Sequence, residues 1–143
     1  MRIQILTDIA TEPVTLTELK AALRVTGNGH DATLTSMITA ARRYMEKAIQ
    51  KSLGERTIKV TSEDELEDYE LPYGPNQTIT DEDTDDDDNY IYTYTAGFDE
   101  VPEDIKQGIM YLVKHWYDID DVAAPVPASV EKIIALNVET PML

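Results

Sequence analysis

The chain contains no cysteine among its 143 residues. A disulfide, a thiolate metal site and a cysteine nucleophile are therefore excluded, and nothing requires an oxidising compartment. Its apolar runs are also short, far below the roughly 20 residues that a membrane-spanning helix needs. The N-terminal stretch lacks the apolar segment and small-residue cleavage site of a signal peptide. We therefore expect a soluble, intracellular protein with no membrane partner.

Basic residues are scarce and unevenly placed. The chain has 12 Lys and Arg against 28 Asp and Glu, which gives a net charge of −16. Residues 62–104 hold 17 of the acids and no base, whereas the two flanking segments are nearly neutral. This excess of negative charge argues against a nucleic-acid-binding surface, which is normally basic. It favours a segment that orients the protein against a partner or repels polyanions.

Two long segments have the periodicity of amphipathic helices. In residues 31–53, apolar side chains recur at steps of three and four. They are Leu34, Met37, Ile38, Ala41, Met45, Ala48, Ile49 and Leu53. We expect Asp31 to cap this helix and Gly54 to end it. The second segment is 101–117, with Pro102 at the first helical position, and the two apolar faces are expected to pack together.

Two shorter helices are predicted near the ends of the chain. Thr15 and Glu18 have the spacing of a capping box that opens a helix over 16–24. Ser129 is expected to cap a last helix over 130–136.

Strand signals occur in three places, at residues 2–10, 56–61 and 90–95, where β-branched and aromatic residues alternate with polar ones. Residues 81–89, DEDTDDDDN, are expected to form a solvated loop because such an acidic run cannot pack in a core. We therefore predict a mainly α fold, namely a small bundle of three to five helices with an inserted small antiparallel β element and acidic loops.

The order of these elements predicts a single domain over residues 1–143. It would comprise an N-terminal arm (1–13), a helical half (14–54), a β and loop insertion (55–98) and C-terminal helices with a tail (99–143).

The sequence proposes no catalytic constellation. His30, His115 and the serines lie in no recognisable nucleophile or acid–base context, so we predict neither an enzyme nor a cofactor. The acidic run partly matches a Ca²⁺-binding EF-hand loop through Asp81, Asp83, Asp85 and Asp87. However, the sixth position is Asp86 instead of glycine and the twelfth is Tyr92 instead of glutamate. We predict no dedicated metal site there.

Three groups of residues are candidates for interaction surfaces. The acidic run is interpreted as a repulsive surface that keeps DNA from sticking. Its members are Asp81, Asp83, Asp85, Asp86, Asp87 and Asp88. The basic face of the 31–53 helix, with Arg42, Arg43, Lys47 and Lys51, complements the acidic middle segment and permits head-to-tail association that closes into a ring. Tyr90, Tyr92 and Tyr94 share one face of a strand, where a core role and an interface role remain equally open. Trp116 is expected to be core.

The ordered set of segments resembles the head–tail connector proteins of tailed bacteriophages. The resemblance rests on VTLTELKAALRV (14–25), DATLTSMITAARRYMEKAIQKSL (31–53), ELPYGPNQTIT (70–80), YTAGF (94–98) and VPEDIKQGIMYLVKHWYD (101–118). The DEDTDDDD stretch departs from the moderate hairpin that is usual in the family.

The resemblance implies a non-enzymatic virion protein at the head–tail junction, assembled in the bacterial host cytoplasm. It implies a ring of identical copies, twelve in the virion, that completes the head, extends the DNA channel and lets DNA pass without specific binding. The implied partners are the portal protein and a tail-side stopper or completion protein. Residues 128–143, with Lys132, Ile133 and Leu136, would contact the portal, and the β loops would contact other copies or the tail side.

Two other functions remain open at this point. An acidic adaptor module would bind a basic protein as a stable monomer, and a Ca²⁺-responsive binder would change its stability with Ca²⁺.

Overall fold

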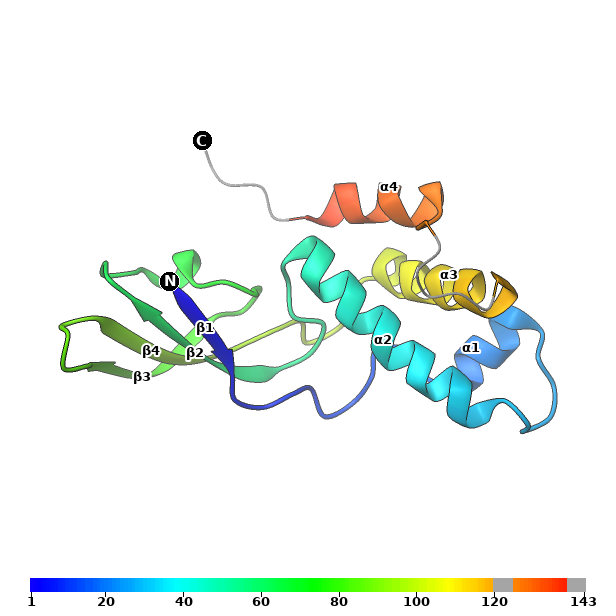
Figure 1. The fold of residues 1–143 in the computed structure, drawn as a ribbon, viewed down its shortest axis with the longest axis horizontal. Coiled ribbons are helices and arrows are strands. Elements are labelled where there is room, and N and C mark those ends of the chain that lie inside the picture. The colour runs from blue at the N-terminus through cyan, green and yellow to red at the C-terminus, as the bar shows by residue number, and fades with distance from the viewer. Residues whose placement is uncertain (120–124, 139–143) are drawn as a thin grey trace. The chain divides into compact units, whose positions relative to one another are not determined.

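A computed structural model describes residues 1–119 and 125–138 (Figure 1). The chain divides into two compact units. The sheet unit comprises Met1–Thr11 and Gln50–Glu100, and the helical unit comprises Glu12–Ile49 and Val101–Leu143. Each unit combines two stretches that are far apart in the sequence.

The described residues form four α-helices, a 3₁₀ turn and four strands. The helices are α1 (Leu16–Leu23), α2 (Asp31–Ile49), α3 (Glu103–Ile119) and α4 (Ala128–Asn137). The strands are β1 (Arg2–Ile5), β2 (Arg56–Ser62), β3 (Thr78–Thr84) and β4 (Tyr90–Ala96), and the 3₁₀ turn is Asp68–Glu70. None of the helices in these ranges combines the length and the apolar composition needed to cross a bilayer.

The prediction of a mainly α fold was wrong. The structure is mixed, because the β part is a complete four-stranded antiparallel sheet in the order β1-β2-β4-β3 instead of a small insertion. Two features hidden in the sequence account for the difference. The N-terminal arm joins the sheet as β1 through long-range pairing with β2, and β3 extends into the acidic run as far as Thr84.

Several predicted helix ends also needed correction. The capping box of Thr15 and Glu18 is present at the start of α1. In contrast, α2 ends at Ile49, and the positive φ of +59° at Gln50 stops it well before Gly54. Pro102 precedes α3 instead of lying within it, and Ser129 lies inside α4, whose cap position is Pro127.

The helical unit is built around α2 and α3, which pack along their apolar stripes as predicted (Figure 1). Leu34, Ile38 and Met45 of α2 are buried, as are Ile109 and Trp116 of α3. α4 packs on α3 where Gly108 leaves space, since a side chain there would meet the side chains of Met45 and Ile133.

The sheet unit has its core on one face of the sheet. Ile58 and Val60 of β2 and Tyr92 and Tyr94 of β4 are buried there. The chain between β2 and β3 crosses this face and contributes Leu66, Leu71 and Tyr73 to the core.

Two tyrosine hydroxyls hold this covering segment in place. The backbone N–H of Leu66 donates to the Tyr92 hydroxyl at 2.8 Å, and the Tyr94 hydroxyl donates to the carbonyl of Pro72 at 2.6 Å. Burial raises the pKa of Tyr94 well above its ordinary value, with a smaller effect from Tyr73. The hydroxyl therefore stays protonated as a donor at any physiological pH.

Gly97 is required where the end of β4 meets the chain after α2. Its φ is +134°, and a Cβ at this position would overlap the carbonyl of Gly54. Its N–H also donates to the carbonyl of Pro75 at 2.8 Å. Any side chain here must therefore displace backbone, which a folded core resists.

We predict that Gly97→Ala destabilises the protein by at least about 3 kcal/mol, from backbone strain and the steric overlap together. For a domain of this size, the melting temperature should fall by roughly 10 °C, measured by circular dichroism. Gly27→Ala is the matched control, because Gly27 also has a positive φ (+82°) but open space around it. It should cost only about 1 kcal/mol. Equal shifts for the two variants would contradict the overlap at Gly97.

Candidate interaction surfaces

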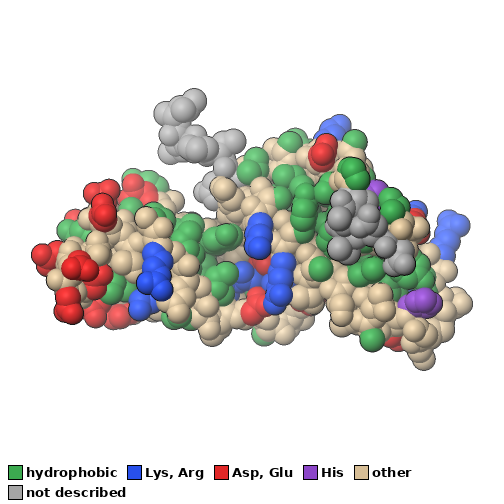
Figure 2. Space-filling model, viewed as in Figure 1, with side chains coloured by type: hydrophobic (Ala, Val, Ile, Leu, Met, Phe, Trp, Pro, Cys, Tyr) green, Lys and Arg blue, Asp and Glu red, His purple; other side chains and the backbone are tan. Residues whose placement is uncertain are grey.

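The acidic run lies on the β3–β4 hairpin, and acidic side chains gather at this end of the sheet unit (Figure 2). Asp81 and Asp83 are exposed residues of strand β3, so the expectation of a continuous solvated loop was wrong for this half of the run. The strand forms there because each residue pairs with a β-prone partner on β4 and keeps its carboxylate in solvent.

The hairpin turn is organised by Asp85. Its carboxylate accepts from the backbone N–H groups of Asp87 and Asn89, both at 2.9 Å, and from the side-chain amide of Asn89 at 3.0 Å. These hydrogen bonds, above all those from Asn89, lower the pKa of Asp85 below its ordinary value. Asp85 therefore has a structural role in the turn, whereas Asp86, Asp87 and Asp88 are exposed.

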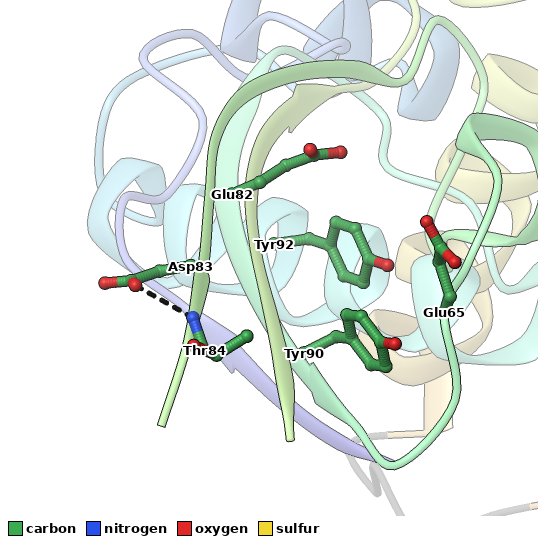
Figure 3. A pocket seen from close by; sticks show the side chains of 6 residues that line it. All are labelled: Glu65, Glu82, Asp83, Thr84, Tyr90 and Tyr92. Carbon is green, nitrogen blue, oxygen red and sulfur yellow. Dashed lines mark hydrogen bonds between the residues drawn. The ribbon is translucent and has the colours of Figure 1, made fainter. Parts of the chain in front are cut away.

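An open pocket of about 260 Å³ lies between the hairpin and the segment that covers the sheet (Figure 3). The rings of Tyr90 and Tyr92 stack with their centroids 6.5 Å apart and an interplanar angle of 14°. Figure 3 shows Glu65 across from their hydroxyl ends and Glu82 beside Tyr92. The carboxylate of Asp83 points away and accepts from the N–H of Thr84.

This arrangement of aromatic faces and carboxylates suits a cationic side chain. In the described ranges, no lysine or arginine lies within ion-pair distance of Glu65 or Glu82. Sequence reasoning missed this pocket because Glu65 and Glu82 come from separate acidic segments and only the folded chain brings them together. In the same ranges, no group of three or more potential ligands is arranged to hold a metal ion.

The predicted basic face of α2 is not a single surface. Arg42 is buried, with 3% of its side chain exposed, and it pairs with Glu12 and Glu46 at 2.9 Å each. Its Nε also donates to Glu12 at 3.0 Å. Lys51 belongs to the sheet unit, so the exposed basic residues of α2 are Arg43 and Lys47.

Arg42 therefore serves the interior of the helical unit instead of an exposed surface. Glu46 follows it by four residues on the same helix, and this spacing is a signal in the sequence for the Arg42–Glu46 ion pair. The ion pair of Arg42 with Glu12 joins residues 30 positions apart and has no signal in the sequence.

The tyrosines of β4 differ in exposure. Tyr92 and Tyr94 share the inner face of the sheet with Ile58 and Val60, and they are only 2% and 0% exposed. Tyr90 is partly buried and lines the pocket. The structure thus places two of the three in the core and leaves Tyr90 as the one available for contact.

The C-terminal candidates lie on α4. Lys132 and Leu136 are exposed, Leu136 to 74%, whereas Ile133 is half-buried against the space left by Gly108. The helix is tied to α3 by Asn137, whose amide donates to Asp104 at 2.7 Å. Residues 139–143 of the predicted portal-contacting tail lie outside the described residues.

The family of the chain follows from a comparison with protein-family models. The model described as "Phage gp6-like head-tail connector protein" matches residues 13–123. The chain belongs to this family. The family consists of structural virion proteins, and this connector protein is accordingly a structural component of the head–tail junction of a virion.

Solved structures share its fold over the whole chain. A chain from "Virion of native gene transfer agent (GTA) particle" has a TM-score of 0.80 at 21% identity. Chains from "Neck of empty GTA particle computed with C6 symmetry" and "Neck of native GTA particle computed with C12 symmetry" have TM-scores of 0.78 and 0.74 at 18% and 19% identity. Each comparison covers 100% of this chain and 98% of the other. The search of curated proteins gave no match.

We predict that Arg42→Met destabilises the connector by about 3–5 kcal/mol, because it removes a buried guanidinium that pairs with the buried carboxylate of Glu46 at 2.9 Å. Arg43→Met, on the adjacent exposed residue, should cost less than about 1 kcal/mol. Urea unfolding measures both changes. Adding Glu46→Leu to Arg42→Met should recover part of the loss, because it removes the buried carboxylate that Arg42 neutralised. Equal, small effects of Arg42→Met and Arg43→Met would return Arg42 to the set of surface candidates.

We also predict a pH-dependent turn at Asp85. The pKa of Asp85 is lowered in the folded chain. The charged carboxylate therefore stabilises the turn fully at pH values above the ordinary aspartate pKa, and this stabilisation is lost as the pH falls through the lowered pKa. Carboxyl-detected NMR titration should show this low pKa, and Asn89→Ala should raise it toward the ordinary value. An unchanged titration in Asn89→Ala would show that these hydrogen bonds do not set the pKa.

Proposed function

We propose that copies of this connector form a closed ring between the portal protein and the tail-side stopper or completion proteins, extending the DNA channel and completing the head. The observation that carries the proposal is the family match, which spans both units of the chain. The likeness to neck chains from particles computed with C6 and C12 symmetry supports a ring, with twelve copies as the expected number.

The charge distribution supports a ring through which DNA passes without being held. The sheet unit carries the exposed acids Asp81, Asp83, Asp86, Asp87 and Asp88. A surface of this kind repels phosphates, so DNA beside it would slide instead of binding. We further propose a purely structural protein without catalytic activity. His30, one of the two histidines, packs edge-on against Tyr117 with centroids 5.7 Å apart, which is an ordinary structural contact.

Within this function, we propose α4 as the portal-contacting element. Lys132 and Leu136 are exposed on it, and a large exposed apolar side chain such as Leu136 is a typical interface anchor. Crosslinks from α4 found only on tail-side proteins would contradict this assignment. We also propose that the two units act as one connector domain, since each is assembled from both halves of the chain.

The proposal is tested by native mass spectrometry with negative-stain electron microscopy, at several protein concentrations and at low and moderate salt, with and without portal rings. We expect closed rings of one fixed stoichiometry, formed alone or on the portal. The same rings should not retain double-stranded DNA on a filter at moderate salt. A monomer in all conditions, with saturable and salt-sensitive binding to a basic protein, would contradict the ring and favour an adaptor.

A further inference from the structure

The sheet unit ends in two open edges. β1 pairs only with β2, and β3 pairs only with β4, within the described part of the chain (Figure 1). All four residues of β1 are exposed, including Ile3 (43%) and Ile5 (47%). Such edges carry backbone N–H and C=O groups that are ready to pair with another strand.

The two edge strands, β1 and β3, run in opposite directions. The sheet has four strands, and each is antiparallel to its neighbour. When a second copy in the same orientation brings its β1 beside β3 of the first, the two strands are therefore antiparallel. No inversion of the second copy is needed, so the contact is heterologous and repeats from copy to copy, as a ring requires.

The register across the sheet matches complementary residues at these two edges. Arg2 is level with Thr61, Ile91 and then Asp83. By the same steps, Gln4 is level with Asp81, and Ile5 is level with Ile79. A straight continuation of the sheet would therefore set Arg2 against Asp83 on one face and Ile5 against Ile79 on the other.

Charge favours this pairing over a contact between two β3 edges. Two β3 edges would bring Asp81, Glu82 and Asp83 against their own copies, and like charges on paired strands repel. β1 carries Arg2 and no acid. We infer that β1 of one copy pairs with β3 of the next and joins their sheets, which also covers Ile3 and Ile5. This inference rests on the proposed ring and names the contact between its copies.

Paired cysteines test the register directly, because the chain has no cysteine of its own. In the double variant Gln4→Cys/Asp81→Cys, the thiol at position 4 of one copy should face the thiol at position 81 of the next copy. Residues directly opposite each other on paired strands are close enough to form a disulfide. After mild oxidation of the full-length protein, we expect a ladder of oligomers on non-reducing gels that collapses on reduction. The matched control is Gln4→Cys/Asp88→Cys, which moves the second thiol from β3 to the turn beyond it and should give no ladder.

A charge exchange gives a second, independent readout. Arg2→Asp and Asp83→Arg should each weaken self-association at least about fivefold, measured by analytical ultracentrifugation, and the double variant should recover most of it. Folding of each variant is checked by circular dichroism.

The outcomes separate this inference from the ring itself. Rings without the ladder, a ladder from the control pair as well, or the absence of any ladder would overturn the strand pairing. A specific ladder on open filaments that never close would support the pairing and contradict the ring. A specific ladder from closed rings, together with recovery in the charge exchange, would establish both.

Discussion

The sheet unit depends on one constraint, which is that its acidic chain contains almost no counter-charge. From residue 62 to residue 104 there is no lysine or arginine, so ion pairs within this stretch cannot offset its repulsion. Most of these acids are exposed to solvent, on the segment between β2 and β3 as well as on β3 and its turn. The unit is held together by apolar contacts on the inner face of the sheet. The buried tyrosines of β4 contribute in two ways. Their rings fill the core, and their hydroxyls hold the covering segment by hydrogen bonds to its backbone.

The helical unit handles charge in the opposite way. It buries an arginine and satisfies it with two carboxylates, of which Glu46 is itself buried. The guanidinium joins α2 to the chain that precedes α1, with five N–H donors in a planar fork that suits two acceptors. An arginine that was predicted to lie on a surface is therefore part of the interior, and the exposed cations of α2 are Arg43 and Lys47.

These two arrangements leave specific surfaces available to a connector. On the sheet unit they are the acidic hairpin, the tyrosine–glutamate pocket and the two unpaired edges. On the helical unit they are the outer side of α4 and the exposed part of α2. A structural virion protein needs contacts of this kind more than it needs a catalytic cleft, because its work is to hold identical copies and two different neighbours in register.

Local signals predicted much of this structure correctly. The helices α1, α2 and α3, the strands β2 and β4, the capping box at Thr15 and the burial of Trp116 are all expressed by neighbouring residues. Periodicity and capping act over a few residues, so they can be read directly from the chain. The ordered set of helical and non-helical segments was likewise enough to indicate the connector family.

The tertiary structure decided the features that join distant residues. The pairing of β1 with β2 connects residues more than 50 positions apart, the ion pair of Arg42 with Glu12 spans 30 positions, and the pocket unites two acidic segments. A strand edge or an exposed basic stripe looks the same in the sequence whether or not another part of the chain covers it. The sequence alone therefore determined most of the elements, their charge and the family. Long-range packing decided that part of the acidic run forms a strand, which charges are buried and which strand edges are left open for a partner.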